Sequence, residues 1–245
     1  MPGSETRSTV LRKRGIFPAV VILLASGVAL AQQARPVFSA NEAVERIENL
    51  DTLKAELQQY HECTCKCGCY AKDLDGQADR AIGFLRERAT RRKTSEKLVL
   101  ILDIDETTLS NYPEMVAAGF GYQEAAFDAW VQSAKAPVIP GTLRLYKEAQ
   151  RLNVKVVFIS GRAETERGPT ERNLRAEGID HWERLYLRPA QWKGTIGIFK
   201  AKTRGQLVSA GYTLALNVGD QWSDLKGASE AEFNVKYPNP FYLVP

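Results

Sequence analysis

The sequence carries almost no surplus of charge once its first 31 residues are set aside. Those residues hold four of the chain's 33 basic residues and one of its 29 acidic residues, which leaves 29 basic against 28 acidic residues. A net charge of +1 offers no electrostatic footprint for a nucleic-acid polymer, so we expect no such partner. The chain also lacks internal repeats and low-complexity tracts, and its 44% hydrophobic and 25% charged residues are typical of a globular protein.

The first 31 residues have the pattern of an export signal. Basic residues 12–14 precede an apolar run over residues 16–30, which ends in the A-x-A cleavage pattern Ala29-Leu30-Ala31. Residue 32 is Gln rather than the Cys of a lipoprotein, and the short apolar run favours cleavage over an uncleaved anchor. We therefore predict a signal peptide over residues 1–31. The mature chain would have no membrane span and would be exported to the periplasm or the extracellular space.

Cysteine is absent outside residues 63–69. Within that stretch it occupies alternate positions, at Cys63, Cys65, Cys67 and Cys69. In an exported chain four cysteines favour two disulfides, although the sequence leaves three pairings open. The short C-x-C spacing also suits a soft metal such as zinc or copper(I), and a third alternative is that the thiols have no essential role. His61 lies just upstream and is interpreted as a neighbour only.

Two amphipathic helices are expected on either side of this cysteine-rich loop. Apolar residues recur at helical spacing over residues 41–59, with Asn41 as N-cap, and again over residues 74–89. We therefore assign residues 41–95 to a helical N-terminal segment and residues 96–245 to the main core. Aromatic residues are frequent between positions 112 and 140, which indicates an irregular cap insertion at about 110–140. Each of these rings could instead pack against the N-terminal helices.

Strands and helices alternate through the core. Strands are expected at residues 98–102, 154–159, 185–187, 213–218 and 233–235, and helices at residues 142–152, 170–176 and 198–210. The unbroken apolar run from Leu98 to Leu102 is typical of a central strand that is buried on both faces. The pattern predicts a doubly wound α/β fold, with a mostly parallel, Rossmann-like sheet and helices on both faces.

Carboxylates directly follow the expected central strand in the sequence. Asp103 and Asp105 are two residues apart, and Thr107 comes next. Open α/β sheets bind ligands at the carboxyl ends of their strands, where one acid can attack or hold a metal while the other transfers protons. Taken alone, the pattern is equally compatible with an Asx-turn capped by Thr107.

Three further motifs begin near expected strand ends or helix starts. Ser160-Gly161-Arg162 can present a hydroxyl and N–H groups to an anion or form a plain turn, with Arg162 facing either phosphate or solvent. Lys200 and Arg204 lie one helical turn apart, and either could neutralise a phosphoryl group or be solvated. The segment Gly219-Asp220-Gln221-Trp222-Ser223-Asp224 places two acids four residues apart, which suits a shared site or the capping of a helix.

Together these motifs resemble those of the haloacid dehalogenase superfamily of phosphotransferases. The segment DIDET at 103–107 matches the first motif, Ser160 the second, Lys200 the third, and Gly219-Asp220 through Asp224 the fourth. More closely, LDIDETTLSNYPEM and NVGDQWSDLKG are similar to the acid phosphatase group that contains bacterial class C non-specific acid phosphatases and plant vegetative storage proteins. The resemblance spans about residues 42–245, and the cysteine-rich segment is not part of the family pattern.

The resemblance implies a division of labour between the first two acids. Asp103 would attack phosphorus and form an aspartyl-phosphate. Asp105, oriented by Thr107, would protonate the leaving oxygen and later take a proton from water. The residues implied around the substrate phosphate are Thr107, Ser160, Gly161 and Lys200.

A metal site is also implied. Magnesium would bind the side chains of Asp103 and Asp220 and the backbone carbonyl of Asp105, with Asp224 binding through water or orienting Lys200. Carboxylates that converge at about 4 Å repel each other by roughly 4 kcal/mol at an effective dielectric of about 20, so such a cluster needs a divalent cation or shared protons.

These roles predict a secreted, Mg²⁺-dependent acid phosphatase that acts on small phosphate monoesters. Phosphotransfer to an acceptor other than water is an alternative within the same chemistry. A non-catalytic storage or binding protein on the same scaffold is an alternative from another class, although the intact Asp103 weighs against it. Metal sequestration or redox chemistry at the cysteines is a third. Nucleotides are candidate substrates, because Tyr112, Phe120 or Trp130 could stack on a base.

Overall fold

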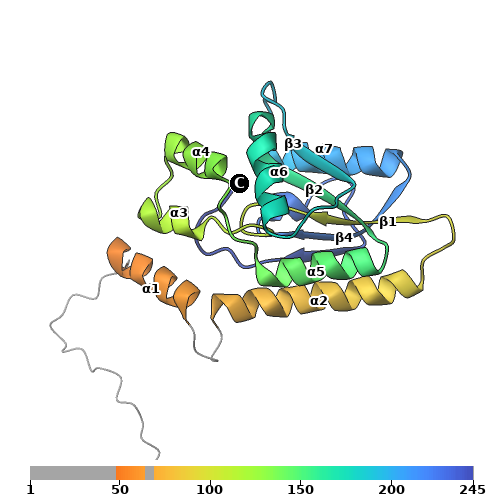
Figure 1. Ribbon diagram of the computed structural model, residues 1–245, viewed down its shortest axis with the longest axis horizontal. Coiled ribbons are helices and arrows are strands. Elements are labelled where there is room, and N and C mark those ends of the chain that lie inside the picture. Colours follow the sequence, from red (N-terminus) through yellow and green to blue (C-terminus); the bar gives the residue numbers. More distant parts are fainter. Residues whose placement is uncertain (1–47, 64–68, 245) are drawn as a thin grey trace, which may run out of the picture. The chain divides into compact units, whose positions relative to one another are not determined.

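The structure, a computed structural model, describes residues 48–63 and 69–244. Its centre is a five-stranded sheet in the order β3-β2-β1-β4-β5, and every neighbouring pair is parallel (Figure 1). The strands are β1 (Lys97–Leu102), β2 (Lys155–Ala163), β3 (Arg184–Arg188), β4 (Tyr212–Gly219) and β5 (Phe233–Lys236). The predicted α/β fold with a parallel sheet is therefore confirmed.

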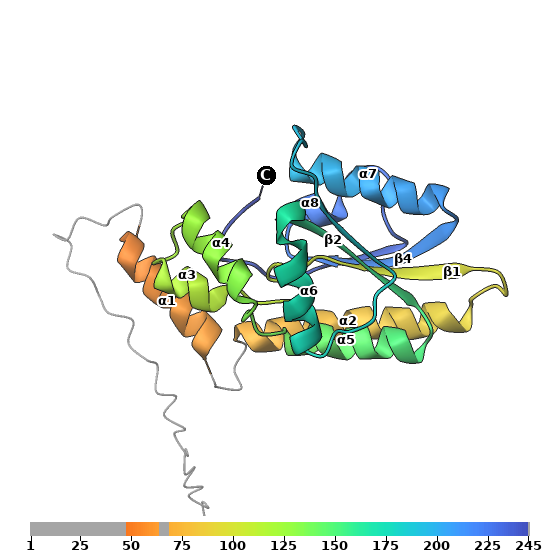
Figure 2. The ribbon, with the colours of Figure 1, turned by 45° about the horizontal axis from the view of Figure 1, so that its top comes forward.

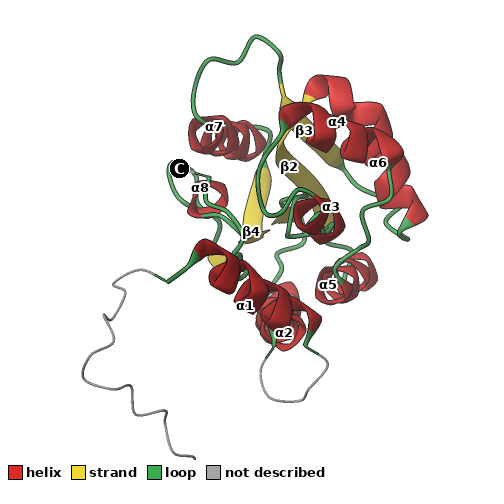
Figure 3. Ribbon diagram, turned by 90° about the vertical axis from the view of Figure 1, so that its left-hand side faces the viewer, coloured by secondary structure: helices red, strands yellow, loops and turns green. Residues whose placement is uncertain are grey.

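Helices cover both faces of this sheet. Figures 1 and 2 show α2 (Tyr70–Thr90) and α5 (Pro140–Arg151) side by side on one face and α7 (Ile196–Ser209) on the other. The end-on view in Figure 3 shows the same layers, with the sheet between α7 and the α2–α5 pair. The remaining elements are α1 (Leu50–Glu62), α3 (Tyr112–Ala117), α4 (Glu124–Ser133), the short turn η1 (Glu164–Glu166), α6 (Arg167–Ala176) and α8 (Trp222–Leu225).

The central strand β1 divides its side chains between two hydrophobic clusters. Leu98, Leu100 and Leu102 pack in the cluster that α2 and α5 share with the sheet, whereas Val99 and Ile101 pack in the cluster beneath α7. Successive side chains of a strand point to opposite faces, so a strand covered on both faces must be apolar throughout. This burial explains the unbroken apolar run, and it fixes where the chain leaves the sheet at Asp103.

Two details of the helix predictions are wrong. Glu48 and Asn49 are not helical, and α1 begins at Leu50, where the Asn49 side chain accepts a hydrogen bond from the backbone N–H of Asp51 at 2.9 Å. Asn41, the predicted N-cap, lies outside the described residues. The expected irregular stretch at 112–140 contains two helices, α3 and α4, because Pro113 lies in the first turn of α3 and good helix formers fill α4.

Several predictions lie outside the described residues. They include the signal peptide at 1–31 and the pairing or metal binding of the cysteine-rich stretch, of which residues 64–68 are not described. Within residues 48–63 and 69–244, none of the helices combines the length and apolar character that a membrane crossing needs.

Candidate active site

Three carboxylates meet at the carboxyl end of the sheet. Asp103, Asp220 and Asp224 are buried, and each offers an oxygen within 4.8 Å of those of the other two. Asp103 follows β1 and Asp220 follows β4, two parallel neighbours in which Leu102 pairs with Val218. Strands in this register end side by side, so the acids that follow them converge, as the sequence motifs imply.

Asp224 reaches the same point from the first turn of α8, and Gly219 makes its approach possible. A Cβ atom at position 219 would lie 2.4 Å from the Cβ and Oδ2 atoms of Asp224, closer than any side chain tolerates. The side chain of Asp224 also accepts a hydrogen bond from the backbone N–H of Gln221 at 2.8 Å. Glycine is thus required at 219 for space rather than for an unusual backbone angle.

Lys200 of α7 joins two of these acids. Its Nζ atom lies 2.5 Å from Oδ1 of Asp103 and 2.6 Å from Oδ1 of Asp224, and all three side chains are buried. Burial alone would lower the pKa of Lys200, but the two carboxylates outweigh it and raise that pKa above its ordinary value. The lysine therefore stays charged and bridges Asp103 and Asp224.

Asp220 is fixed by three hydrogen-bond donors. Thr107 Oγ1 donates to Oδ1 at 3.0 Å, while the amides of Gln221 and Asn239 each donate to Oδ2 at 2.7 Å. The buried hydroxyl of Thr107 contacts Asp220 rather than Asp105, so the predicted orientation of Asp105 by Thr107 is wrong, while substrate binding by Thr107 stays a prediction. A main-chain turn at 104–109 directs Thr107 towards β4 rather than back along its own segment.

The charges of this cluster suit a divalent cation. Burial, followed by the neighbouring acids, raises the pKa of Asp103 and lifts that of Asp220 to about 6. At the 4.8 Å limit, each pair of carboxylates repels by about 3.5 kcal/mol at an effective dielectric of about 20. Lys200 supplies one positive charge against three negative ones, and carboxylate oxygens are the ligands that Mg²⁺ prefers. The donor set therefore fits such an ion.

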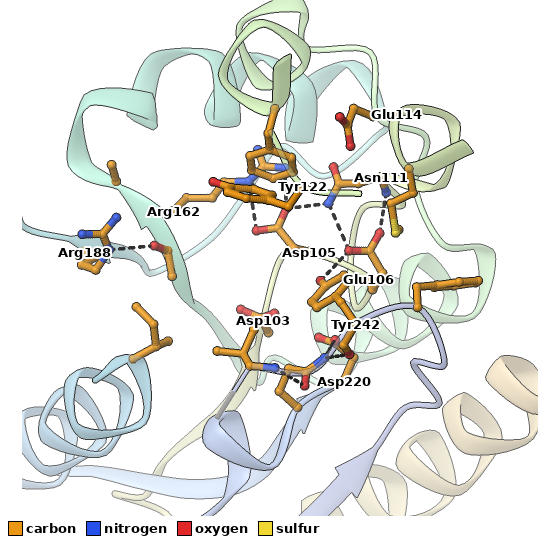
Figure 4. A pocket seen from close by; sticks show the side chains of 18 of the residues that line it. Asp103, Asp105, Glu106, Asn111, Glu114, Tyr122, Arg162, Arg188, Asp220 and Tyr242 are labelled. Atoms are coloured by element: carbon orange, nitrogen blue, oxygen red, sulfur yellow. Dashed lines mark hydrogen bonds and ion pairs between the residues drawn. The ribbon is translucent and has the colours of Figure 1, made fainter. Parts of the chain in front are cut away.

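Asp105 faces a different set of partners, shown at the centre of Figure 4. Arg162 donates to Oδ1 from Nη2 at 2.7 Å and from Nε at 3.0 Å, and Asn111 Nδ2 donates to the same oxygen at 2.8 Å. Burial alone would raise the pKa of Asp105, but Arg162 and Asn111 outweigh it and lower that pKa. Arg162 is only 4% exposed, so its predicted position in solvent is not found, whereas it lines the cavity described below and its contact with phosphate stays a prediction.

Glu106 and Asn111 form a buried cluster beside Asp105. Glu106 accepts hydrogen bonds from the backbone N–H of Asn111 at 2.6 Å, from its Nδ2 at 3.2 Å and from the Tyr242 hydroxyl at 2.6 Å. Burial and the charges of Asp105 and Asp220 raise the pKa of Glu106 to about 8. Neither residue was among the predicted site residues. In the sequence, the signal was their position, because Glu106 directly follows Asp105 and Asn111 comes six residues after it.

The other predicted phosphate ligands have separate surroundings. Ser160 is buried within β2, whose register with β3 shifts between Ile159 and Ala163. Its Oγ accepts a hydrogen bond from the backbone N–H of Arg162 at 3.2 Å, and Gly161 lines the cavity described below. Arg204 is not a phosphate ligand. Its guanidinium is buried and donates to the backbone carbonyls of Asp224, Lys226, Ala228 and Ser229, which fixes the loop after α8.

A cavity of about 630 Å³ opens above these groups. Asp103, Asp105 and Lys200 lie in its wall, and Phe120, Tyr122 and Phe127 from the segment around α3 and α4 line it as well. Of the three rings predicted to stack on a base, only Phe120 is a lining residue. Tyr112 is buried, stacks on His61 with ring centroids 3.3 Å apart and donates its hydroxyl to Glu62 at 2.9 Å.

A parallel α/β sheet with an acid pair after its central strand, a lysine and two further acids at the same edge is the arrangement of the haloacid dehalogenase (HAD) class. The family comparison agrees with this class and narrows it. The model of the HAD superfamily, subfamily IIIB (acid phosphatase), matches residues 25–245, and the chain belongs to this family.

Named relatives are found among plant proteins. The chain is 38% identical over 150 residues to Acid phosphatase 1 of Solanum lycopersicum, a match that covers 60% of this chain and 59% of that protein. It is 32% identical over 206 residues to Vegetative storage protein 1 of Arabidopsis thaliana, covering 81% and 74%. The chain thus spans about three fifths of the length of the tomato protein.

A solved structure has the same fold. The class C acid phosphatase from Bacillus anthracis, determined with tungstate bound, superimposes with a TM-score of 0.63. The superposition covers 80% of this chain and 87% of that one, at 24% sequence identity. Its likeness shows the arrangement of the sheet and helices.

Proposed function

We propose that this protein is a secreted, Mg²⁺-dependent acid phosphatase that hydrolyses small phosphate monoesters through an aspartyl-phosphate on Asp103. The observation that carries the proposal is the convergence of Asp103, Lys200, Asp220 and Asp224 within one buried cluster, with Asp105 in the wall of the same cavity. Membership of the acid phosphatase subfamily supports the reaction type.

In the first step Asp103 attacks the phosphorus of the ester. The new bond joins a carboxylate oxygen to phosphorus while the bond from phosphorus to the leaving oxygen breaks. Asp105 gives its proton to that oxygen. In the second step Asp105 takes a proton from water, the water oxygen bonds to phosphorus, and the bond to Asp103 breaks.

Separate sets of residues would hold the metal and the substrate phosphate. Asp103 and Asp220, with the backbone carbonyl of Asp105 and with Asp224 close by, would hold Mg²⁺. When bound, the ion supplies positive charge that offsets the buried acids and the phosphate oxygens. Ser160, the backbone at Gly161 and Lys200 would hold the non-bridging phosphate oxygens, on which charge redistributes during transfer.

Two alternatives differ in what the intermediate does. A phosphotransferase would pass the phosphoryl group to an alcohol, and a storage protein would not form the intermediate at all. The storage-protein names of the Arabidopsis relatives support the storage-protein alternative, whereas the intact Asp103 supports an enzyme. Export is supported by the leader sequence and by relatives named as stem glycoproteins of Glycine max.

The test is hydrolysis of a substrate panel by the mature chain and by Asp103→Asn. The panel contains aryl phosphates, sugar phosphates and 5′- and 3′-nucleotides. We expect the substitution to lower turnover by at least about 1,000-fold because it removes the nucleophile. Asp79→Asn is the matched control, since Asp79 is an exposed acid on α2 that pairs only with Arg144 among the described contacts. Turnover retained by Asp103→Asn would contradict the proposal.

A further inference from the structure

Asn111 uses both the nitrogen and the oxygen of its side-chain amide in hydrogen bonds beside the acid/base residue. It lies at the start of α3 and is 1% exposed. Its Nδ2 atom donates to Asp105 Oδ1 at 2.8 Å and to Glu106 Oε2 at 3.2 Å, while its Oδ1 atom accepts the indole N–H of Trp130 at 2.9 Å. Trp130 belongs to α4, in the segment between β1 and β2, so this hydrogen bond connects α4 to Asp105.

The tryptophan decides which way the amide points. An amide side chain presents an acceptor on one side and donors on the other, and a half-turn about its last bond would exchange them. The indole N–H can only donate, so it requires the oxygen of Asn111 on its own side. The nitrogen must then face the carboxyl oxygens of Asp105 and Glu106, to which it donates.

The same contacts make the two oxygens of Asp105 unequal. Oδ1 accepts three donor groups, which are Arg162 Nη2 at 2.7 Å, Arg162 Nε at 3.0 Å and Asn111 Nδ2 at 2.8 Å. Among residues 48–63 and 69–244, the one contact to Oδ2 comes from Arg162 Nε at 3.2 Å. The lone pairs of Oδ1 are therefore occupied, and Oδ2 is the oxygen with room to carry a proton.

We propose that Asn111 is a positioning residue for proton transfer, which holds Oδ1 of Asp105 so that Oδ2 exchanges the proton with the substrate, and that Trp130 of α4 sets the orientation of Asn111. This inference rests on the proposed role of Asp105 as acid and base. It adds a contribution from α4, through one indole N–H group, to a step that the HAD motifs assign to Asp105 alone.

The leaving-group dependence of kcat/KM isolates this step. A good leaving group departs without a proton, whereas a poor one needs the general acid. Because kcat/KM covers only the steps up to the first irreversible one, later hydrolysis of the intermediate does not enter. Substituted phenyl phosphates, from phenyl to dinitrophenyl, vary the leaving group with little change of shape.

We expect Asn111→Ala to lower kcat/KM for phenyl phosphate by about 10- to 100-fold and for dinitrophenyl phosphate by less than about threefold. Trp130→Phe keeps an aromatic ring and removes the indole N–H. We expect it to lower kcat/KM for phenyl phosphate by about two- to tenfold, again with a smaller loss for dinitrophenyl phosphate. Trp192→Phe is the matched control, because its indole N–H donates to the backbone carbonyl of Thr195 outside the cavity. Asp105→Asn supplies the reference slope for loss of the acid itself.

Equal losses across the whole ester series, in variants that fold, would overturn the inference and indicate a structural role. If Asn111→Ala does not fold, Trp130→Phe decides alone, and a slope equal to that of wild type would overturn the role of α4. Failure of the proposed function has a different signature, since Asp103→Asn would then stay active or Asp105→Asn would not change the slope.

Discussion

The cavity has two sides that are built differently. On the metal side, Asp103, Asp220 and Lys200 come from the ends of β1 and β4 and from α7, so the packing of regular elements sets their positions. On the proton side, Asp105 is held by the side chains of Arg162, near the end of β2, and Asn111, at the start of α3. The metal side thus depends on sheet register, whereas the proton side depends on individual hydrogen bonds that single substitutions can remove (Figure 4).

Removal of the metal should have the largest effect on turnover, and it tests the metal side. We expect a chelator to lower turnover by at least about 100-fold, because metal ions contribute several kcal/mol of transition-state stabilisation. Added Mg²⁺ should restore the rate, and circular dichroism should show an intact fold throughout. Full activity in thoroughly metal-free enzyme would mean that the acid cluster serves another purpose.

Thr107→Val tests the metal side more finely. The substitution keeps the shape of the side chain and removes one of the three donors to Asp220. Loss of a hydrogen bond to a metal ligand typically lowers metal affinity by about 10- to 100-fold, so the Mg²⁺ concentration for half-maximal activity should rise accordingly.

The slope of kcat/KM against leaving-group pKa should stay unchanged in Thr107→Val at saturating Mg²⁺. The control is Thr90→Val, which removes a hydroxyl bonded to a backbone carbonyl at the end of α2. A changed slope with unchanged Mg²⁺ requirement would place Thr107 on the proton side after all, next to Asp105.

Glu106→Gln should have the smallest effect, on the pH dependence of stability. The pKa of Glu106 is raised to about 8 in the folded protein, against about 4.3 for an unfolded glutamate. The folded state therefore keeps a proton that the unfolded state releases, and this group's contribution to stability is lost as pH rises towards 8. Between about pH 5 and pH 8 the free energy of unfolding should fall by at least about 1 kcal/mol more in wild type than in Glu106→Gln.

Urea unfolding at both pH values measures this difference at one fixed Mg²⁺ concentration. Glu87→Gln serves as control, because Glu87 is an exposed acid on α2. Parallel pH dependences in wild type and Glu106→Gln would show that Glu106 is ionised in the folded protein already at low pH.

The sequence predicts the metal side of the cavity better than the proton side. Asp103 and Asp220 follow apolar strands, and neighbouring parallel strands bring their ends together whatever the rotamers are, so motif positions predict the cluster. The partner of Thr107, the burial of Arg162 and the carbonyl contacts of Arg204 depend on how one turn or loop folds back, which spacing does not encode. The hydrogen bond between Asn111 and Trp130 joins the start of α3 to α4. The aromatic composition of residues 112–140 did not predict either helix.

The central claim is that Asp103 carries the phosphoryl group between the two steps. Rapid acid quenching of enzyme mixed with radiolabelled dinitrophenyl phosphate, followed by peptide mapping, tests it most directly. We expect label on the peptide that contains Asp103, more of it in Asp105→Asn, where the base for hydrolysis is missing, and none in Asp103→Asn. Label on another residue, or unlabelled Asp105→Asn that still releases dinitrophenol, would contradict the account.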